Sequence, residues 1–475
     1  MESFDVVIIG AGPAGCVLAN RLSADPSCRV LLIESGPPDK YPLIHVPKGL
    51  AKLHRVNRFM WNFDDDKTVT DTSPYPQWLR GRTLSGSSSI NGMTYTRGQP
   101  SDYDEMAAVT RDDWSWARML EAFKAIDDHG LGPSTRRGTG GPLKISAFPY
   151  DCGAEGLMEA AIQSAELNGM ERREDVNDPD EAAKIGYKIR TIHKRRRQSA
   201  AVTILRPVID LHNLVVRAGL LADRILFEGN RAVGVLCSDG DGREEYIMGR
   251  RIVPSAGSIC SPALLQRSVI GAPELLASLG IPVVSACPDV ERNLVAHTSI
   301  TLMYRCWGPS NNSRYRGLGA LLSGIRYYLF HSGPLAHAVF EATGPYKTGS
   351  DAKRPEGQIH FGPHSFIDFH KTSRRPDPQP GFMLLPFPLR PRSKGQIYIQ
   401  SRDPAATPKI VYDPLADPED RRELIAGVRL ARSIVATSPL ASNRPVAVPR
   451  ARAALARRNG RHVRTISTAQ VKEHQ

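Results

Sequence analysis

The sequence predicts an α/β plus α+β chain, with a Rossmann-like dinucleotide-binding domain and a second domain built on an antiparallel sheet flanked by helices. Three observations predict this fold class. A glycine-rich turn near the N-terminus joins a strand to a helix, β-branched runs at 213–217, 232–235 and 251–256 can extend the same sheet, and alternating stretches begin near Thr298. Such alternation is typical of antiparallel strands with one covered face.

The first βαβ unit has the expected length. Residues 4–9 form a short β-branched run, which leads into the turn over 10–15 and a helix-compatible segment over 16–22. A second apolar run, residues 30–33, ends at Glu34. Strand, tight turn, helix and strand therefore follow one another within a single compact unit.

The turn carries a GxGxxG fingerprint in the right context. Gly10 allows the tight turn, Gly12 lets the backbone approach a pyrophosphate, and Gly15 lets helix and strand pack closely. We expect Glu34 to accept hydrogen bonds from an adenosine ribose, which makes NADP the least favoured dinucleotide. The fingerprint alone leaves FAD and NAD open.

The later chain predicts the second domain. Alternating stretches at 357–362, 382–385 and 395–400 are expected to be strands of its antiparallel sheet. Residues 417–433 show helical spacing, with Pro418 near the start.

Length and composition set the class. The 475 residues suggest two or three domains, and 41% hydrophobic with 23% charged residues is an ordinary globular balance. No uncharged apolar run approaches the ~18 residues of a membrane span, and Glu2 and Asp5 stand where a signal peptide would be basic. We therefore expect a cytoplasmic chain.

Its seven cysteines have no CxxC spacing, so we predict reduced thiols and no metal site.

The net charge of +13 is concentrated in two places. The last 35 residues hold eight basic residues and one acid, a net +7, and residues 193–197 read His-Lys-Arg-Arg-Arg. Neither cluster has interleaved aromatics, so we interpret both as solvated loops and predict no nucleic-acid partner. Binding of nucleic acid or an acidic membrane through the basic tail is a remote alternative.

The segment over 80–94, Arg-Gly-Arg-Thr-Leu-Ser-Gly-Ser-Ser-Ser-Ile-Asn-Gly-Met-Thr, resembles the first signature of the glucose-methanol-choline oxidoreductases. Residues 257–265 resemble the second signature, and 289–294 before His297 also match the family pattern. The resemblance covers about residues 4–440. It implies FAD as the cofactor and argues against an NAD-dependent dehydrogenase.

A Gly/Ser-rich loop of this kind can surround pyrophosphate and the flavin edge with its amides and hydroxyls. Some relatives attach FAD through a histidine before the signature asparagine, but Ile90 stands there, so we predict non-covalent FAD. The resemblance implies FAD contacts from Leu84, Ser87, Asn91, Gly92, Met93 and Thr94, and from the backbone of Ala222.

Three residues depart from the family pattern. Ser85, Val269 and Glu291 stand where the family usually has glycine. A side chain is costly where φ is positive, so each raises a question about local backbone geometry.

The resemblance implies a discontinuous division of the chain. We predict an FAD-binding domain over 1–150 and 199–297, a substrate domain over 151–198 and 298–440, and a basic, disordered or aberrant tail over 441–475.

The family's catalytic histidine, a general base late in the chain, has no recognised counterpart here. The resemblance fades after Leu440, and His462 lies in a Gly-Arg-His-Val-Arg setting unlike the catalytic motif. His474 lies at the end of the chain. We therefore assign no catalytic residue, and interpret three further histidines as structural or pocket-lining: His297, His360 and His364.

The resemblance implies an FAD-dependent oxidoreductase that transfers hydride from the CH–OH group of a primary alcohol, choline-like or other, to FAD. The alternative is a catalytically inactive flavin-binding fragment of such an enzyme.

Overall fold

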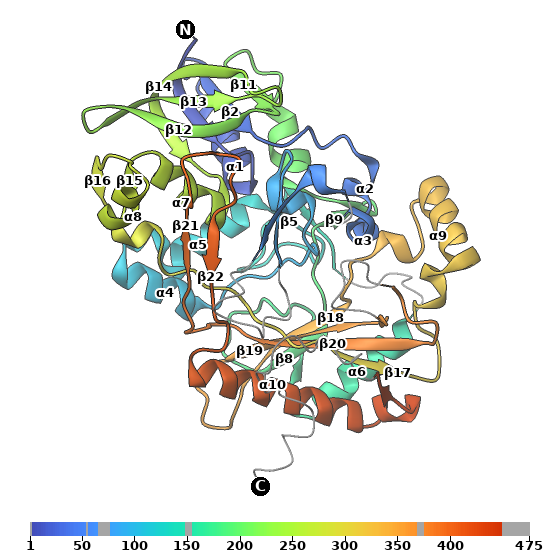
Figure 1. Cartoon of the computed structure of the whole chain (residues 1–475). Coiled ribbons are helices and arrows are strands. Elements are labelled where there is room, and N and C mark those ends of the chain that lie inside the picture. The colour runs from blue at the N-terminus through green and yellow to red at the C-terminus, as the bar shows by residue number, and fades with distance from the viewer. Residues whose placement is uncertain (1, 54–55, 65–76, 148–153, 368–374, 449–475) are drawn as a thin grey trace, which may run out of the picture.

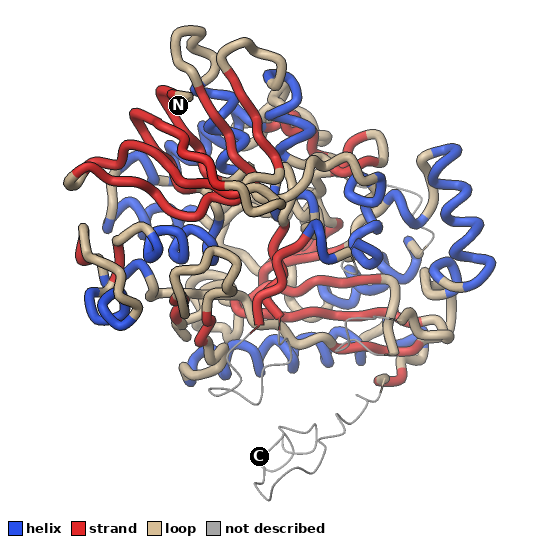
Figure 2. The backbone as a smooth tube through the Cα atoms, turned by 45° about the horizontal axis from the view of Figure 1, so that its top comes forward, coloured by secondary structure: helices blue, strands red, loops and turns tan. Residues whose placement is uncertain are grey.

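The computed structural model describes residues 2–53, 56–64, 77–147, 154–367 and 375–448 (Figure 1). Two sheets organise this part of the chain, and Figure 2 shows their strands as two separate groups. His462 and His474 lie outside the described residues.

The first sheet has six strands and contains the predicted βαβ unit. Its first four strands are parallel, and the last two are antiparallel additions. All five residues of the 30–34 strand are buried, as expected for a parallel strand covered on both faces. In spatial order the strands are β11 (Leu214–Ala218), β2 (Val30–Glu34), β1 (Ser3–Ile9), β14 (Glu244–Pro254), β13 (Arg231–Ser238) and β12 (Leu221–Glu228), with helices α1 (Pro13–Leu22) and α7 (Gly257–Arg267) packed on them. This is the predicted Rossmann-like domain.

The second sheet has seven strands, and every pairing except β7–β8 is antiparallel. Helices α6 (Glu155–Glu166) and α10 (Pro418–Ala436) cover one face, while the other is turned toward the first sheet (Figure 1). Asp417 caps α10 by accepting from the Glu419 amide at 2.8 Å. In spatial order the strands are β23 (Val446–Ala447), β17 (Leu302–Arg305), β20 (Gly381–Pro388), β19 (Gly357–Gly362), β18 (Ala342–Tyr346), β8 (Lys184–Tyr187) and β7 (Glu171–Arg172).

Short two-stranded pairs, two of them parallel, and helices fill the space around the two sheets. The two-stranded pairs are β3 (Met60–Asp64) with β4 (Gln77–Gly81), β5 (Asp127–His129) with β6 (Leu143–Ile145), β9 (Ile192–His193) with β10 (Arg196–Arg197), β15 (Ile270–Gly271) with β16 (Ser285–Ala286), and β21 (Gln396–Tyr398) with β22 (Lys409–Val411). The remaining α-helices of the described chain are α2 (Pro42–His45), α3 (Leu50–Leu53), α4 (Pro100–Val109), α5 (Trp116–Ile126), α8 (Pro273–Ser278) and α9 (Gly317–Phe330).

Two sequence expectations need correction. Residues 395–400 were expected in the second sheet, but β21 pairs only with β22 and packs on α7 of the Rossmann-like domain. The Gln266 side chain explains this, because its Oε1 accepts from the Ile399 amide at 2.8 Å and its Nε2 donates to the Ile397 carbonyl at 3.0 Å. The tail was expected to begin at 441, but β23 still pairs with β17, so the sheet continues to Ala447.

Candidate functional site

The glycine turn has the geometry of a dinucleotide-binding turn. Gly10 has a φ of +101°, a conformation that residues with a side chain rarely adopt. A Cβ on Gly15 would lie 2.0 Å from the Gly10 carbonyl oxygen, so helix and strand can approach only without it. A Cβ on Gly12 would meet nothing closer than 3.9 Å, and Gly12 lines a cavity at the N-terminus of α1. The positive end of that helix therefore faces open space, where a pyrophosphate can bind.

Glu34 lies at the end of β2 in the same cavity. Its Oε2 accepts from the Ala11 amide at 3.0 Å, and its Oε1 accepts from the Gly36 amide at 2.9 Å. Burial raises the pKa of this carboxyl to about 7, although both amide hydrogen bonds oppose the rise. The carboxylate keeps acceptor capacity for a ribose hydroxyl.

The signature loop packs directly on the glycine turn. A Cβ on Gly86 would lie 3.0 Å from the Gly12 Cα, so the two backbones are in close contact. Because of this contact, the next residue, Ser87, lines the cavity beside the turn. Leu84 instead points into the hydrophobic core that contains Cys16 and Leu32. Leu84 and Gly15 therefore support the cavity from behind, while the predicted site residues that line it are Gly10, Gly12, Glu34, Ser87 and Ala222.

Sequence reasoning missed part of this cavity. Trp61 and Phe63 of β3, whose rings stack at 6.0 Å, line it, as do residues 404–408 from the loop between β21 and β22. Aromatic and proline residues in a loop or hairpin carry no signal that would assign them to a cofactor, and residues 404–408 reach the cavity only because β21 packs on α7.

The second half of the signature loop, Asn91 to Thr94, lies between the two domains. The Thr191 amide donates to the Met93 carbonyl at 3.0 Å, and the Tyr95 amide donates to the Ile189 carbonyl at 2.9 Å. Thr94 forms a β-bridge with Arg190. A Cβ on Gly92 would meet nothing within 4 Å, so open space lies beside the backbone there. The predicted flavin contacts, residues 91–94, therefore lie beside residues 189–191, which follow β8 of the second sheet.

Arg197 holds this loop, and its interpretation as a solvated residue was wrong. Only 1% of Arg197 is exposed. Its guanidinium donates to the Ile44 carbonyl at 2.9 Å, the Asn91 carbonyl at 2.8 Å, the Asn91 Oδ1 at 2.7 Å and the Ser88 carbonyl at 3.2 Å. Burial lowers its pKa to about 9. The cluster looked uniformly solvated because sequence cannot tell which of four consecutive basic residues turns inward.

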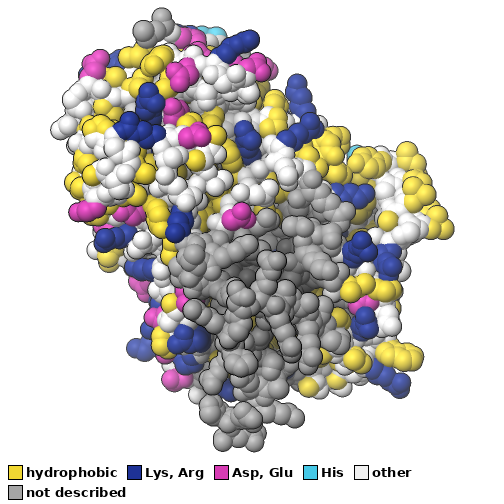
Figure 3. Space-filling model, viewed as in Figure 1, with side chains coloured by type: hydrophobic (Ala, Val, Ile, Leu, Met, Phe, Trp, Pro, Cys, Tyr) yellow, Lys and Arg dark blue, Asp and Glu magenta, His cyan; other side chains and the backbone are white. Residues whose placement is uncertain are grey.

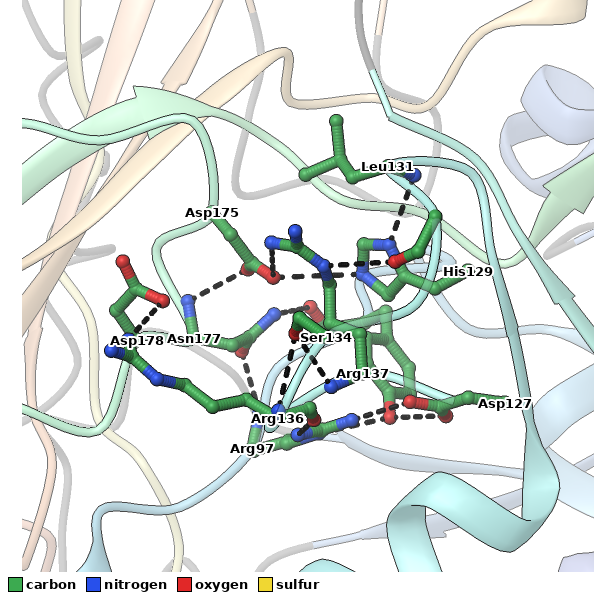
Figure 4. Close-up of polar contacts among 12 residues, drawn as sticks. Arg97, Asp127, His129, Leu131, Ser134, Arg136, Arg137, Asp175, Asn177 and Asp178 are labelled. Carbon is green, nitrogen blue, oxygen red and sulfur yellow. Dashed lines mark hydrogen bonds and ion pairs between the residues drawn. The ribbon is translucent and has the colours of Figure 1, made fainter. Parts of the chain in front are cut away.

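A buried polar network fixes the chain just after the loop (Figure 4). The Tyr95 hydroxyl donates to Asp127 Oδ1 at 2.6 Å, and the Arg97 side chain also bonds to this fully buried carboxylate. The Arg97 amide donates to Asn177 Oδ1 at 2.9 Å. This network joins the end of the signature loop to β5 and to residues 175–178.

The three departures from glycine differ in their consequences. Ser85 and Val269 have φ values of +76° and +68°, so both hold side chains in the left-handed region. Glu291 has a φ of −89°, where any residue is tolerated, and the concern raised for it does not apply. Ile90 is buried in a hydrophobic cluster with Ile44 and Phe59. Its side chain has no group that could form a covalent bond to FAD.

The sheet face turned toward the Rossmann-like domain carries polar side chains among aromatic ones. Ile359 and Phe361 of β19 point into the core under α6 and α10, so the alternating His360 points the other way. His360 Nδ1 lies 2.7 Å from Thr343 Oγ1, and burial holds the pKa of His360 well below its usual range. Lys188 lies on this side with its Nζ 5.0 Å from the centre of the Phe340 ring, and burial lowers its pKa to about 7.

The remaining candidate histidines are placed differently. His297 is exposed, with its Nε2 3.0 Å from the Leu389 carbonyl. His364 is buried, and burial together with Lys48 keeps its pKa well below the usual range. Among the described residues, no histidine lines the cofactor cavity.

Comparisons with known proteins agree with this geometry. Two models described as GMC oxidoreductase match residues 4–299 and 391–474. The chain belongs to the GMC oxidoreductase family. The family's members are FAD-binding flavoenzymes, so FAD is the cofactor, and the glycine turn, Glu34 and the open backbone at Gly92 fit it. The second match reaches beyond Leu440, where sequence inspection alone no longer detected the resemblance.

Individual GMC relatives resemble most of the chain. A mitochondrial choline dehydrogenase from Mus musculus is 33% identical over 93% of this chain and 74% of its own length. An alcohol dehydrogenase [acceptor] from Pseudomonas putida is 35% identical over 91% of this chain and 78% of its own length. The crystal structure of pyridoxine 4-oxidase from Mesorbium loti superposes with a TM-score of 0.79 at 28% identity, covering 92% of this chain and 81% of that one.

Proposed function

We propose that this GMC oxidoreductase oxidises the CH–OH group of a primary alcohol and passes a hydride to non-covalently bound FAD. The observation that carries the proposal is the placement of the signature loop. Its first half closes the cofactor cavity over Gly12, and its second half lies against residues 189–191, which follow strand β8 of the second sheet. Cofactor and substrate elements therefore meet along one loop.

Each group in the site has a physical role. Bound FAD supplies the hydride acceptor. The N-terminus of α1 would stabilise the pyrophosphate, and Glu34 would fix the ribose. Arg197 holds Ser88 and Asn91 in place, so that Asn91 to Thr94 would border the flavin. The sheet face with Lys188, Thr343 and His360 would form the opposite side of the substrate space.

The charges on that face favour an uncharged alcohol over choline. Glu341, a fully buried acid there, lies 2.6 Å from Arg190, whose side chain is 1% exposed. Lys48 lies 4.0 Å from the same carboxylate, and Lys188 is nearby. Among the described residues, the acid on this face is therefore already neutralised by Arg190 and Lys48, and a quaternary ammonium would be buried there without a counter-ion of its own.

A second candidate is a flavin-binding protein that does not turn over. It is favoured by the depressed pKa of His360 and His364, which makes both weak proton acceptors.

One experiment separates the two. The purified chain, loaded with FAD, is mixed without oxygen with a panel of primary alcohols and choline while the flavin bands are followed. Bleaching by uncharged alcohols ahead of choline supports the proposal. Flavin that stays oxidised with every alcohol supports the inactive alternative. A His462→Gln variant that bleaches as fast as the unchanged chain would agree with the exclusion of His462 as the base, and a variant that no longer bleaches would overturn it.

A further inference from the structure

Helix α9 presents its apolar side to solvent. Seven large hydrophobic side chains of this helix are between 46% and 73% exposed. Soluble surfaces carry single exposed apolar residues, but a contiguous patch of this kind marks an interaction site. The seven residues, called the α9 stripe below, are Leu318, Leu321, Leu322, Ile325, Tyr328, Leu329 and Phe330.

The orientation of α9 is fixed by its opposite side. Ser323 and Tyr327 are buried, and they lie one turn apart on the same face. The Ser323 hydroxyl donates to the Arg314 carbonyl at 2.9 Å, and the Tyr327 hydroxyl donates to the Arg195 carbonyl at 3.1 Å. With 3.6 residues per turn, Leu318, Leu322 and Leu329 fall on the far side from these anchors. Figure 1 shows the helix projecting from the body, and Figure 3 shows hydrophobic side chains gathered over it.

The charge around the stripe is entirely positive along the chain. Between Glu291 and Glu341 there are five arginines and no acidic residue, and three of the arginines, Arg314, Arg316 and Arg326, belong to α9 or its N-terminal approach. The hydrogen bond of Tyr327 also places the β9–β10 hairpin against the buried side of α9. Lys194 and Arg196 of this hairpin are exposed.

We propose that the α9 stripe docks this protein on the surface of an anionic membrane. An exposed apolar stripe bordered by arginine and lysine is the pattern of a helix that lies in the headgroup region. The basic residues would contact anionic headgroups while the leucines enter the acyl boundary. At 14 residues α9 is too short to cross a bilayer, and within the described chain no helix is long and apolar enough to do so. A partner protein with a neutral surface would account for the stripe but not for the one-sided charge.

The test uses the FAD-loaded full chain in co-sedimentation with phosphatidylcholine vesicles, with and without phosphatidylglycerol. We expect binding to vesicles that contain phosphatidylglycerol, weakening as salt is added. The combined variant Leu318→Gln, Leu322→Gln and Leu329→Gln should lower the bound fraction at least tenfold. The matched control, Val109→Gln with Leu167→Gln, changes side chains that are 83% and 72% exposed elsewhere and should bind as before.

A second variant tests the charge. Lys194→Gln with Arg196→Gln leaves the stripe intact and should weaken binding to phosphatidylglycerol vesicles several-fold. Equal sedimentation of the leucine variant and the unchanged chain would overturn the proposal. So would a protein that ignores vesicles but self-associates in light scattering, with the leucine variant remaining monomeric, because the stripe would then join two copies. Unchanged thermal unfolding of all variants shows that each is folded.

Discussion

The state of Glu34 makes a sharp prediction about cofactor affinity. The carboxyl is 6% exposed, and burial raises its pKa to about 7 in the protein without FAD. A ribose hydroxyl donates a stronger hydrogen bond to the ionised carboxylate than to the acid. FAD should therefore favour the ionised form, so that binding releases a proton and becomes tighter as pH rises.

The size of the effect follows from this pKa. At about pH 5.5 only about 3% of a group with a pKa of about 7 is ionised. If only the ionised form bound FAD, the dissociation constant would be about 30-fold higher than at about pH 8, or about 2 kcal/mol, and this is the upper limit of the effect. Below pH 7 the affinity should fall by at most about tenfold per pH unit. Glu34→Gln should remove this dependence and weaken binding at pH 8, because an uncharged amide is the poorer acceptor.

The dissociation constant can be measured from the quenching of FAD fluorescence by the apoprotein across this pH range. Proton release can be measured by calorimetry in two buffers of different ionisation enthalpy. Glu423 provides the control, since its pKa is also raised to about 7 but it lies on α10, beneath the second sheet. Glu423→Gln should keep the full dependence. A dissociation constant independent of pH in the unchanged chain, or an equal slope in Glu34→Gln, would refute the reasoning.

Three further predictions concern the loop and its strain. Arg197→Met leaves four acceptors without their donor and should cost about 3 kcal/mol in urea unfolding and weaken FAD binding. Arg196→Met on the exposed side should change both little, and equal losses would contradict the buried role of Arg197. Val269→Gly removes a β-branched side chain from the left-handed region, and it should stabilise the fold by about 1 kcal/mol after the loss of partial burial is subtracted. Ser85→Gly should bring no gain in stability, because the Ser85 Oγ accepts a hydrogen bond from a buried amide at 2.9 Å. The opposite order of the two stabilities would refute the strain argument. Because Ile90 replaces the histidine of covalent relatives, acid precipitation should release all FAD into the supernatant, and yellow colour in the pellet would contradict this.

The Rossmann-like domain could be predicted because its signals are local. The turn from Gly10 to Gly15 and the acid Glu34 could be recognised because each directly follows a predicted strand. The loop over 80–94 could be recognised from its resemblance to the family signature. The contacts that complete the site are not local. Arg197 bonds to Asn91 across more than a hundred residues, and residues 404–408 reach the cavity only through the packing of β21 on α7. A basic cluster and a proline-rich turn have no periodicity that could reveal such contacts.

The β9–β10 hairpin connects the two proposals. Arg197, at its end, holds the signature loop through Ser88 and Asn91, while the Arg195 carbonyl, in its turn, accepts from Tyr327 of α9. Lys194 and Arg195 have φ values of +46° and +62°, so the turn holds two side chains in the left-handed region at a cost of roughly 1–3 kcal/mol each. A strained turn persists only where surrounding contacts stabilise it. Here the contacts of Arg197 with the signature loop and of the Arg195 carbonyl with Tyr327 do so. A membrane contact that fixes α9 would therefore restrain the same hairpin that positions Asn91, and FAD should dissociate more slowly from vesicle-bound than from free protein. The leucine variant of α9, which keeps Arg197, should lose that difference while retaining the FAD affinity of the free chain.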